Sequence, residues 1–375
     1  MRGLRIHALE STNLITKEGC ERLQRIHTAS TEKHQVYVLG PLCDPQFELT
    51  DLLLYAKNHD ERLWALQEQR FACWADLIEH LLPRLVHDQV MQRIKQGFSD
   101  LEDILKSVWL VQEISEGVRQ YVSKVGDSWV ADLIAHYFSL SSIQCDIIEY
   151  NHLISKEKIS DDALFVYGHL PQAEGSVLKE GLGEYAAASL AAHFKADGVT
   201  FWNNSSLLKN ADSKEVPSAL VIRSLSYSEA TELSFFGAPV IHPQALLPAM
   251  KESIDVVLRY WHDEQDLGTI VSSNASEDHS DRVKGFSIIH DIALINVEGA
   301  GMSGVIGIAS RLFNAMSQAS ISVVLISQAS SEYSICFAVP EKEMEKACET
   351  ARHEFEHELK EHLIQSIEAE GSLAI

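Results

Sequence analysis

Apolar and polar positions follow their most regular pattern in the last third of the chain. An apolar strand at 292–295 leads into a glycine-bearing loop and then, from Val305, into a helix whose apolar residues recur every three or four positions. A β-branched run at 321–326 and alternating apolar residues at 335–339 predict two further strands. Apolar spacing at 344–359 predicts a second helix. This order predicts a small α+β sandwich in which both helices cover one face of a sheet.

The first two thirds of the chain show the pattern of an α/β unit. Short apolar runs at 4–9 and 36–39 flank a helical stretch at 17–29, which predicts a strand–helix–strand opening. Residues 47–140 are then largely helical. Strands are expected again at 143–148, 164–167 and 199–202, with a helix at 184–194.

Charge and cysteine usage narrow the possible partners. The formal net charge of −23 argues against nucleic acid and anionic membranes as partners, because surfaces that bind phosphates need clustered Lys and Arg. Six cysteines are scattered without a C-x-x-C pair, which indicates reduced thiols and no zinc site. No stretch approaches the roughly 18 apolar residues of a membrane helix. We therefore expect a cytoplasmic protein.

Two stretches in the last third match a known family over a long length. They are G-A-G-M-S-G-V-I-G-I-A-S-R-L-F at 299–313 and I-S-V-V-L-I-S-Q-A-S-S-E-Y-S-I-C-F-A-V-P at 321–340. Both resemble the first ACT regulatory domain of aspartokinases, most of all that of the bifunctional aspartokinase/homoserine dehydrogenases. The resemblance implies a ferredoxin-like βαββα domain.

The first 271 residues resemble the amino-acid kinase fold of the same aspartokinases. The resemblance is carried by L-S-Y-S-E-A-T-E-L-S-F-F-G-A-P-V-I-H-P at 225–243 and by G-T-I at 268–270. The expected fold class is α/β, an amino-acid-kinase-like three-layer sandwich followed by the ACT domain. The expected limits are 1–271 for the kinase-like domain, 272–283 for a polar linker, 284–345 for the ACT domain, and 346–375 for a C-terminal helix and part of a second ACT element.

An aspartokinase transfers the γ-phosphoryl group of ATP to the side-chain carboxylate of aspartate. Its site needs a cation, backbone N–H donors and carboxylates that hold magnesium. The family motif K-F-G-G-T-S aligns with residues 5–10, where Arg5 keeps the positive charge, both glycines have gained a Cβ and Glu10 adds negative charge. The motif R-G-E aligns with residues 125–127, where the arginine is lost and Asp127 keeps a shorter carboxylate.

The other two family motifs are also altered. G-R-N-G-S-D aligns with residues 179–184, where Glu180 reverses the charge of the arginine. The nucleotide motif W-T-D-V-D-G-V-Y-T-A-D-P-R aligns with the stretch from Trp202, where two aspartates have become Asn204 and Ser206. An amide or a hydroxyl does not supply the negative charge that magnesium requires.

The alignment leaves few remnants of a catalytic set: Arg5, Asp127 and Asp212. We expect no cofactor, and ATP with Mg²⁺ would bind only if the chain were an active kinase after all. No metal site is expected elsewhere. His353 and His357 share one face of the last predicted helix, but two histidines do not close a site.

In ACT domains of the family, the loop after the first strand and the S-Q-A-S-S-E strand line an amino-acid effector site at a subunit interface. By position, backbone N–H groups around Gly301 to Gly304 would bind the α-carboxylate of threonine or lysine. The same glycines would also serve simply to allow a tight turn. A homodimer through ACT domains is implied as well. The residues that the resemblance places at this effector site are Gly301, Met302, Ser303, Gly304, Gln328, Ser330, Ser331 and Glu332.

Three hypotheses remain open at this point. The first is a catalytically impaired aspartokinase-like protein of aspartate-family amino-acid metabolism that acts as an ACT-containing, amino-acid-responsive regulatory or paralogous subunit. The second is an active aspartate kinase with an atypical nucleotide site. The third is the decayed N-terminal part of a longer bifunctional enzyme without a present role.

Overall fold

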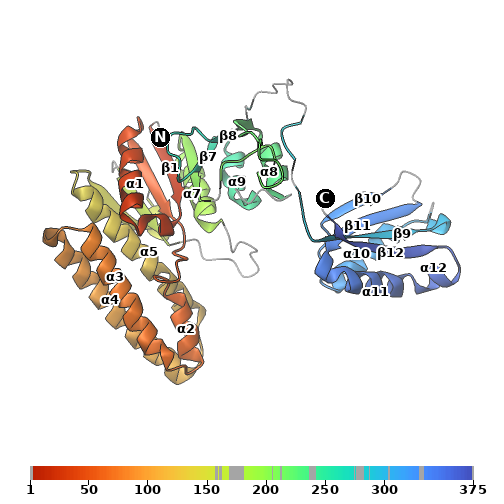
Figure 1. Ribbon diagram of the computed structural model, residues 1–375, viewed down its shortest axis with the longest axis horizontal. Coiled ribbons are helices and arrows are strands. Elements are labelled where there is room, and N and C mark those ends of the chain that lie inside the picture. Colours follow the sequence, from red (N-terminus) through yellow and green to blue (C-terminus); the bar gives the residue numbers. More distant parts are fainter. Residues whose placement is uncertain are drawn as a thin grey trace. The chain divides into compact units, whose positions relative to one another are not determined.

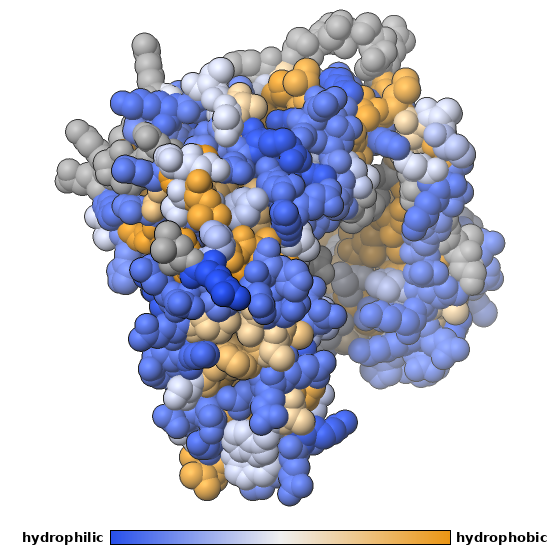
Figure 2. All heavy atoms as spheres, turned by 60° about the vertical axis from the view of Figure 1, so that its left-hand side comes forward, coloured by the Kyte–Doolittle hydropathy of each residue, from blue (hydrophilic) through white to orange (hydrophobic). Residues whose placement is uncertain are grey.

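The computed structural model divides the chain into two compact units, Met1–Gly285 and Phe286–Ile375. We call them the kinase-like unit and the ACT-like unit (Figure 1). The structure describes residues 3–156, 159, 163–168, 181–204, 206–211, 213–235, 242–273, 275, 283–286, 288–302, 305–328 and 333–373. Within these ranges no helix is both long and apolar enough to cross a membrane. The face drawn in Figure 2 is mostly polar, with apolar residues gathered in a few areas.

An eight-stranded sheet in the order β3-β4-β2-β1-β5-β7-β8-β6 forms the centre of the kinase-like unit. All neighbouring strands are parallel except β7 and β8. The central strands are apolar throughout because both of their faces are covered. The strands are β1 (Leu4–Leu9), β2 (His34–Leu39), β3 (Cys145–Glu149), β4 (Ala163–Tyr167), β5 (Gly198–Asn203), β6 (Ser224–Leu225), β7 (Val256–Tyr260) and β8 (Thr269–Val271).

Helices cover both faces of this sheet and create two separate cores. One core joins Leu9 of β1 to α1 (Lys17–Ala29) and α5 (Glu116–Ser139). The other joins Ile6 and Ala8 of β1 to helices on the opposite face. These are α7 (Leu182–Phe194) and α9 (Pro243–Lys251), while α8 (Tyr227–Phe235) packs against α9. The alternating side chains of a single strand thus separate the layers, and the expected three-layer sandwich is confirmed.

The helical region expected at 47–140 contains four helices in the structure: α2 (Thr50–Lys57), α3 (Arg62–Leu81), α4 (Arg84–Val111) and α5. Figure 1 shows α3 and α4 as a long pair lying side by side. Aromatic rings join them to α5, because Trp129 contacts Trp74 edge to face at 5.3 Å and stacks on Phe98 at 5.0 Å. Short helices at η1 (Ser11–Leu14) and α6 (Tyr150–Leu153) complete the described elements of this unit.

The ACT-like unit has a four-stranded antiparallel sheet in the order β10-β11-β9-β12. Its helices pack against one face, as the sequence pattern predicts. The elements are β9 (Ile292–Glu298), η2 (Ala300–Met302), α10 (Ile308–Gln318), β10 (Leu325–Gln328), β11 (Ser334–Pro340), η3 (Glu341–Glu343), α11 (Met344–Glu354), α12 (Glu356–Lys360) and β12 (Ser366–Leu373).

Three expectations for this unit differ from the structure. The first helix begins at Ile308 rather than Val305, because Gly307 at its N-cap has φ +94° and Ile306 is fully exposed. The β-branched run at 321–326 forms a strand only from Leu325, since Ile321 is buried in the core just beyond α10. The third difference lies at the C-terminus.

Residues 346–373 belong to the same unit as the rest of the ACT-like fold. We expected them to form a helix and part of a second ACT element. In the structure β12 instead pairs with β9 from Ser366↔Glu298 to Leu373↔Ile292. Ala351 and Phe355 also pack in the core of this unit. The last strand therefore completes a βαββαβ unit, because β9 would otherwise be an unpaired edge.

Candidate functional site

The carboxyl ends of the parallel strands meet at one edge of the kinase-like sheet, where open α/β sheets bind their ligands. Residues at this edge follow directly after β1, β2, β4 and β5: Glu10, Gly40, Gly168 and Asn204. Two of these four, Glu10 and Asn204, come from the aligned kinase motifs. The edge is therefore the candidate site.

The first and fourth motifs meet through a direct hydrogen bond. The Nδ2 atom of Asn204 donates to Oε2 of Glu10 at 2.6 Å. The side chain of the neighbouring Asn203 forms a different hydrogen bond, from its Nδ2 to the backbone oxygen of Arg259 at 3.1 Å. An amide now stands where the family carries a metal-binding aspartate, and it is bound by a carboxylate from the phosphate-loop position.

The N-terminus of α7 brings the third motif to the same edge. A Cβ added at Gly183 would lie 3.1 Å from the Cα of Gly40, so the two backbones approach closely. The next residue, Glu184, is a carboxylate near Glu10. Burial raises the pKa of Glu184, and the negative charge of Glu10 raises it further. Like charges thus gather at a helix N-terminus that could otherwise bind a phosphate.

Asp127, from the second motif, lies on α5 and is 1% exposed. Its Oδ1 accepts a hydrogen bond of 2.9 Å from the backbone N–H of Leu42. Burial raises the pKa of Asp127 to about 8, although the bond from Leu42 acts in the opposite direction. A carboxyl group with this pKa is mostly protonated at neutral pH. It ties the chain after β2 to α5 and carries little charge for a substrate ammonium group.

Arg5 lies far from this edge. It is the second residue of β1, so about 16 Å of strand separates its Cα from that of Glu10 at 3.3 Å per residue. Its Nη2 and Nε are 3.3 Å and 3.4 Å from Oε1 of Glu32. The structure therefore does not bring Arg5 together with Asp127 at one site. Asp212, the third predicted remnant, lies outside the described residues.

Magnesium and nucleotide do not fit the edge as it is built. The family's metal-binding acid is an amide at Asn204, and the buried Asp127 is mostly neutral. Among the described residues, no group of three or more His, Cys, Asp or Glu side chains could hold a metal ion.

The described residues of the expected effector loop make contacts within the ACT-like unit itself. The N–H of Gly301 donates to the oxygen of Leu363 at 3.0 Å, and a Cβ at Gly301 would lie 2.7 Å from the Cα of Leu363. Met302 is buried in the core, whereas Gln328 is exposed at the end of β10. The remaining expected effector residues lie outside the described residues: Ser303, Gly304, Ser330, Ser331 and Glu332.

Sequence reasoning missed the contribution of the backbone at the candidate site. Gly40 packs closely against Gly183, and the N–H of Leu42 bonds to Asp127. Neither Gly40 nor Leu42 belongs to an aligned motif. Only the glycine at the end of a predicted strand could have served as a signal. Glu184 was aligned with the third motif, but its proximity to Glu10 depends on the fold.

Comparisons with known proteins give the same two parts. The amino acid kinase family matches residues 66–260, which is more than half of the chain, and the ACT domain matches residues 295–355. Bifunctional aspartokinase/homoserine dehydrogenase 1, chloroplastic, from Arabidopsis thaliana is 30% identical over 400 residues, which cover 97% of this chain and 43% of that protein. The bifunctional enzyme of Haemophilus influenzae is 40% identical over 222 residues, 59% of this chain and 27% of that protein.

The chain thus spans less than half the length of these curated relatives. Among solved structures, E. coli aspartokinase III in complex with lysine and aspartate has a TM-score of 0.72 at 17% identity, covering 99% of this chain and 86% of that one. A likeness at this identity shows the fold. The family matches and the chloroplastic relative show that the chain belongs to the amino acid kinase family, as an aspartokinase-like member that carries an ACT domain.

Proposed function

We propose that this chain is a catalytically impaired aspartokinase-like protein of aspartate-family amino-acid metabolism. In this role it acts as an ACT-containing, amino-acid-responsive regulatory or paralogous subunit. Its turnover of ATP and aspartate is absent or marginal. Its expected location is the cytoplasm.

The position of Arg5 is the observation that carries this proposal. A phosphoryl-transfer site must neutralise phosphate charge at the point of transfer. Arg5, the cation of the aligned phosphate motif, lies near the start of β1 and bonds to Glu32. The opposite end of the same strand carries Glu10 instead. Removal of one transition-state donor costs on the order of a hundredfold to a thousandfold in rate, and here several are lost.

The regulatory part of the proposal rests on the ACT-like unit. This unit is a four-stranded fold with its own core, and the part of the chain that matches the ACT domain family, residues 295–355, lies within it. The similar aspartokinase III was solved with lysine bound. We therefore propose a small amino-acid effector, threonine or lysine, and a homodimer through the ACT domains. Strand β10 lies at one edge of the sheet with three of its four residues exposed, which suits pairing between chains.

A coupled assay with aspartate, ATP and Mg²⁺ tests the catalytic half of the proposal. An ordinary aspartokinase assayed at the same protein concentration is the reference. We expect turnover below about 1% of the reference, from the loss of even one donor of the kind described above. Turnover above a few per cent would establish the active-kinase alternative.

A thermal-shift screen across the amino acids tests the regulatory half. A ligand that binds the folded state raises Tm by mass action, and we expect this for threonine or lysine. A folded, soluble chain with such a shift would also exclude a decayed fragment without a role. No shift with any amino acid would contradict an effector function.

A further inference from the structure

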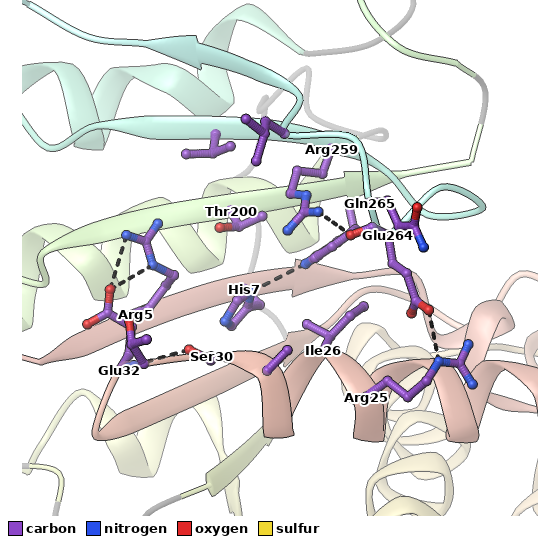
Figure 3. Close-up of a pocket in the computed structure, with 15 residues that line it drawn as sticks. Arg5, His7, Arg25, Ile26, Ser30, Glu32, Thr200, Arg259, Glu264 and Gln265 are labelled. Carbon is purple, nitrogen blue, oxygen red and sulfur yellow. Dashed lines mark hydrogen bonds and ion pairs between the residues drawn. The ribbon is translucent and has the colours of Figure 1, made fainter.

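A cavity of about 480 Å³ lies on one face of the kinase-like sheet. Figure 3 shows that its wall combines side chains of β1, the end of α1, β5, β7 and the β7–β8 turn. None of Glu10, Asp127, Glu184 or Asn204 lines it. We call it the arginine cavity, after Arg5, Arg25 and Arg259 in its wall.

His7 supplies a buried donor to this cavity. The side chain is 3% exposed and stacks on Tyr37, with ring centroids 5.0 Å apart. Its Nδ1 accepts a hydrogen bond of 3.3 Å from Nε1 of Trp202, which places the ring proton on Nε2. Within the described residues, Nε2 is buried and makes no hydrogen bond of normal geometry, although the side chain of Gln35 interacts with the ring. An unsatisfied buried donor is costly, and a ligand acceptor would remove this cost.

Arg259 bonds to backbone oxygens, and no described carboxylate lies within ion-pair distance of it. Burial lowers the pKa of Arg259, while the negative charges of Asp266, Asp263 and Glu264 act in the opposite direction. Its Nη2 donates to the backbone oxygen of Glu264 at 2.6 Å, and its Nε donates to that of Asp266 at 3.1 Å. The guanidinium also lies over the ring of Trp202, 4.5 Å from the centroid. Trp202 therefore contacts both Arg259 and His7, and all three residues line the cavity.

The other two arginines are already neutralised. Arg5 pairs with Glu32 at 3.3 Å, and Arg25 pairs with Glu264 at 2.8 Å. In the described part of the chain, no ion pair is formed by Arg259. Three arginines and two carboxylates line the wall, and Asp263 and Asp266, outside the lining, also act on Arg259.

We propose that the arginine cavity binds a small organic monocarboxylate with a short apolar body. The carboxylate accepts hydrogen bonds from the guanidinium of Arg259 and from Nε2 of His7. Apolar groups in the wall contact the rest of the ligand: Ile26, Ala29, Val257 and Leu267. The planar guanidinium of Arg259 matches one carboxylate. Inorganic phosphate has no apolar body, and ATP carries several negative charges, so both match the wall less well.

Calorimetric titration of the full chain tests this proposal. The probes are 3-methylbutanoate, benzoate, inorganic phosphate and ATP, each at millimolar concentration. We expect saturable binding of a carboxylate probe, one per chain, with quenching of tryptophan fluorescence from the wall. Arg259→Gln and His7→Phe should each weaken binding about tenfold or more, the usual effect of removing one hydrogen bond to a charged group. Arg62→Gln, on the exposed side of α3, is the matched control and should bind as the unmodified chain does.

A third variant covers the case in which the buried substitutions disturb the fold. Ala29 is exposed at the end of α1 and lines the cavity, so Ala29→Trp should block it while the chain stays folded. Three outcomes would overturn the proposal: no saturable binding of either carboxylate, binding that Arg259→Gln and Ala29→Trp leave unchanged, or tighter binding of phosphate or ATP. Arg5 and Glu32 also line this cavity. The proposal still does not depend on catalytic impairment, because the kinase assay measures phosphoryl transfer and this titration measures carboxylate binding at Arg259.

Discussion

The side-chain amide of Asn204 donates a hydrogen bond of 2.6 Å to the carboxylate of Glu10, and this bond joins the ends of β5 and β1. In the aligned family motifs these two positions carry an aspartate and a serine. In this chain an amide stands at the aspartate position and a carboxylate at the serine position, and their hydrogen bond still connects the two strands. The change removes the acid that would hold magnesium and places an acid near the phosphate position.

Asn204→Asp should destabilise the chain. The substitution replaces a donor by a second carboxylate at hydrogen-bond distance from Glu10, so a bond is lost and repulsion is gained. We expect a loss of about 1 kcal/mol in the free energy of unfolding, since the pair is partly exposed. Urea unfolding measures the effect. The double variant Glu10→Gln/Asn204→Asp restores a donor and an acceptor and should recover most of the loss. Equal stability of the single variant and the unmodified chain would show that the bond contributes nothing.

Asp127 should make stability depend on pH. Because the pKa of Asp127 in the fold is about 8, above its unfolded value, the folded state binds more protons between about pH 4 and pH 8. The contribution of this group is complete below pH 4 and is lost as pH rises through 8. Asp127→Asn should therefore gain stability relative to the unmodified chain as pH rises, by up to about 1.4 kcal/mol per pH unit.

Unfolding midpoints at a series of pH values check the Asp127 prediction. Asp88→Asn, at a side chain that is 90% exposed, is the control for the chemical change itself. A difference between Asp127→Asn and the unmodified chain that stays constant from pH 4 to pH 8 would mean that the carboxyl group is ionised in the fold.

Gly183→Ala tests the close approach of α7 to the chain after β2. The new Cβ would lie 3.1 Å from the Cα of Gly40, and a backbone neighbour gives way less readily than a flexible side chain. We expect a loss of about 1–3 kcal/mol from overpacking. Gly117→Ala in α5 is the matched control, because its Cβ would meet nothing within 4 Å. That control should gain about 0.5–1 kcal/mol from helix propensity. If both variants responded alike, the contact at Gly40 would not constrain the edge.

Gly301→Ala tests whether the ACT loop glycine serves the fold. Its Cβ would lie 2.7 Å from the Cα of Leu363, so the loop and the chain before β12 must move apart. We expect a lower Tm for the ACT-like unit even in the absence of any amino acid. An unchanged Tm, with only the amino-acid response altered, would instead assign the glycine to effector binding alone.

Elements with strong periodicity were predictable from the sequence. The helix expected at 17–29 is α1, and the apolar run at 4–9 is β1, because burial of one helix face or of a whole strand leaves a local pattern. Strand β12 escaped prediction because its charged residues hide the alternation, and its pairing with β9 is distant in sequence. Similarly, motif alignment identified Arg5 as the cation of the first motif, but it did not show how far Arg5 lies from the candidate site at the carboxyl ends of the strands.

The candidate site depended even more on the fold. The contacts of Asp127 and Gly183 involve the backbone of Leu42 and Gly40, which residue types do not reveal. The arginine cavity joins Arg5 to Arg259 across three strands, and no spacing in the sequence relates them. Sequence reasoning therefore identified the altered motifs, while the structure was needed to show where their side chains lie.

Single-turnover phosphoryl transfer tests the central claim most directly. The chain, in excess over γ-labelled ATP, is mixed with aspartate and Mg²⁺, and acid-quenched samples are resolved for labelled 4-phosphoaspartate. Because Arg5 is bound to Glu32 and Asn204 to Glu10, we predict no labelled product above the rate without protein. Aspartate-dependent transfer of the label in stoichiometric yield would contradict the account and identify an active kinase.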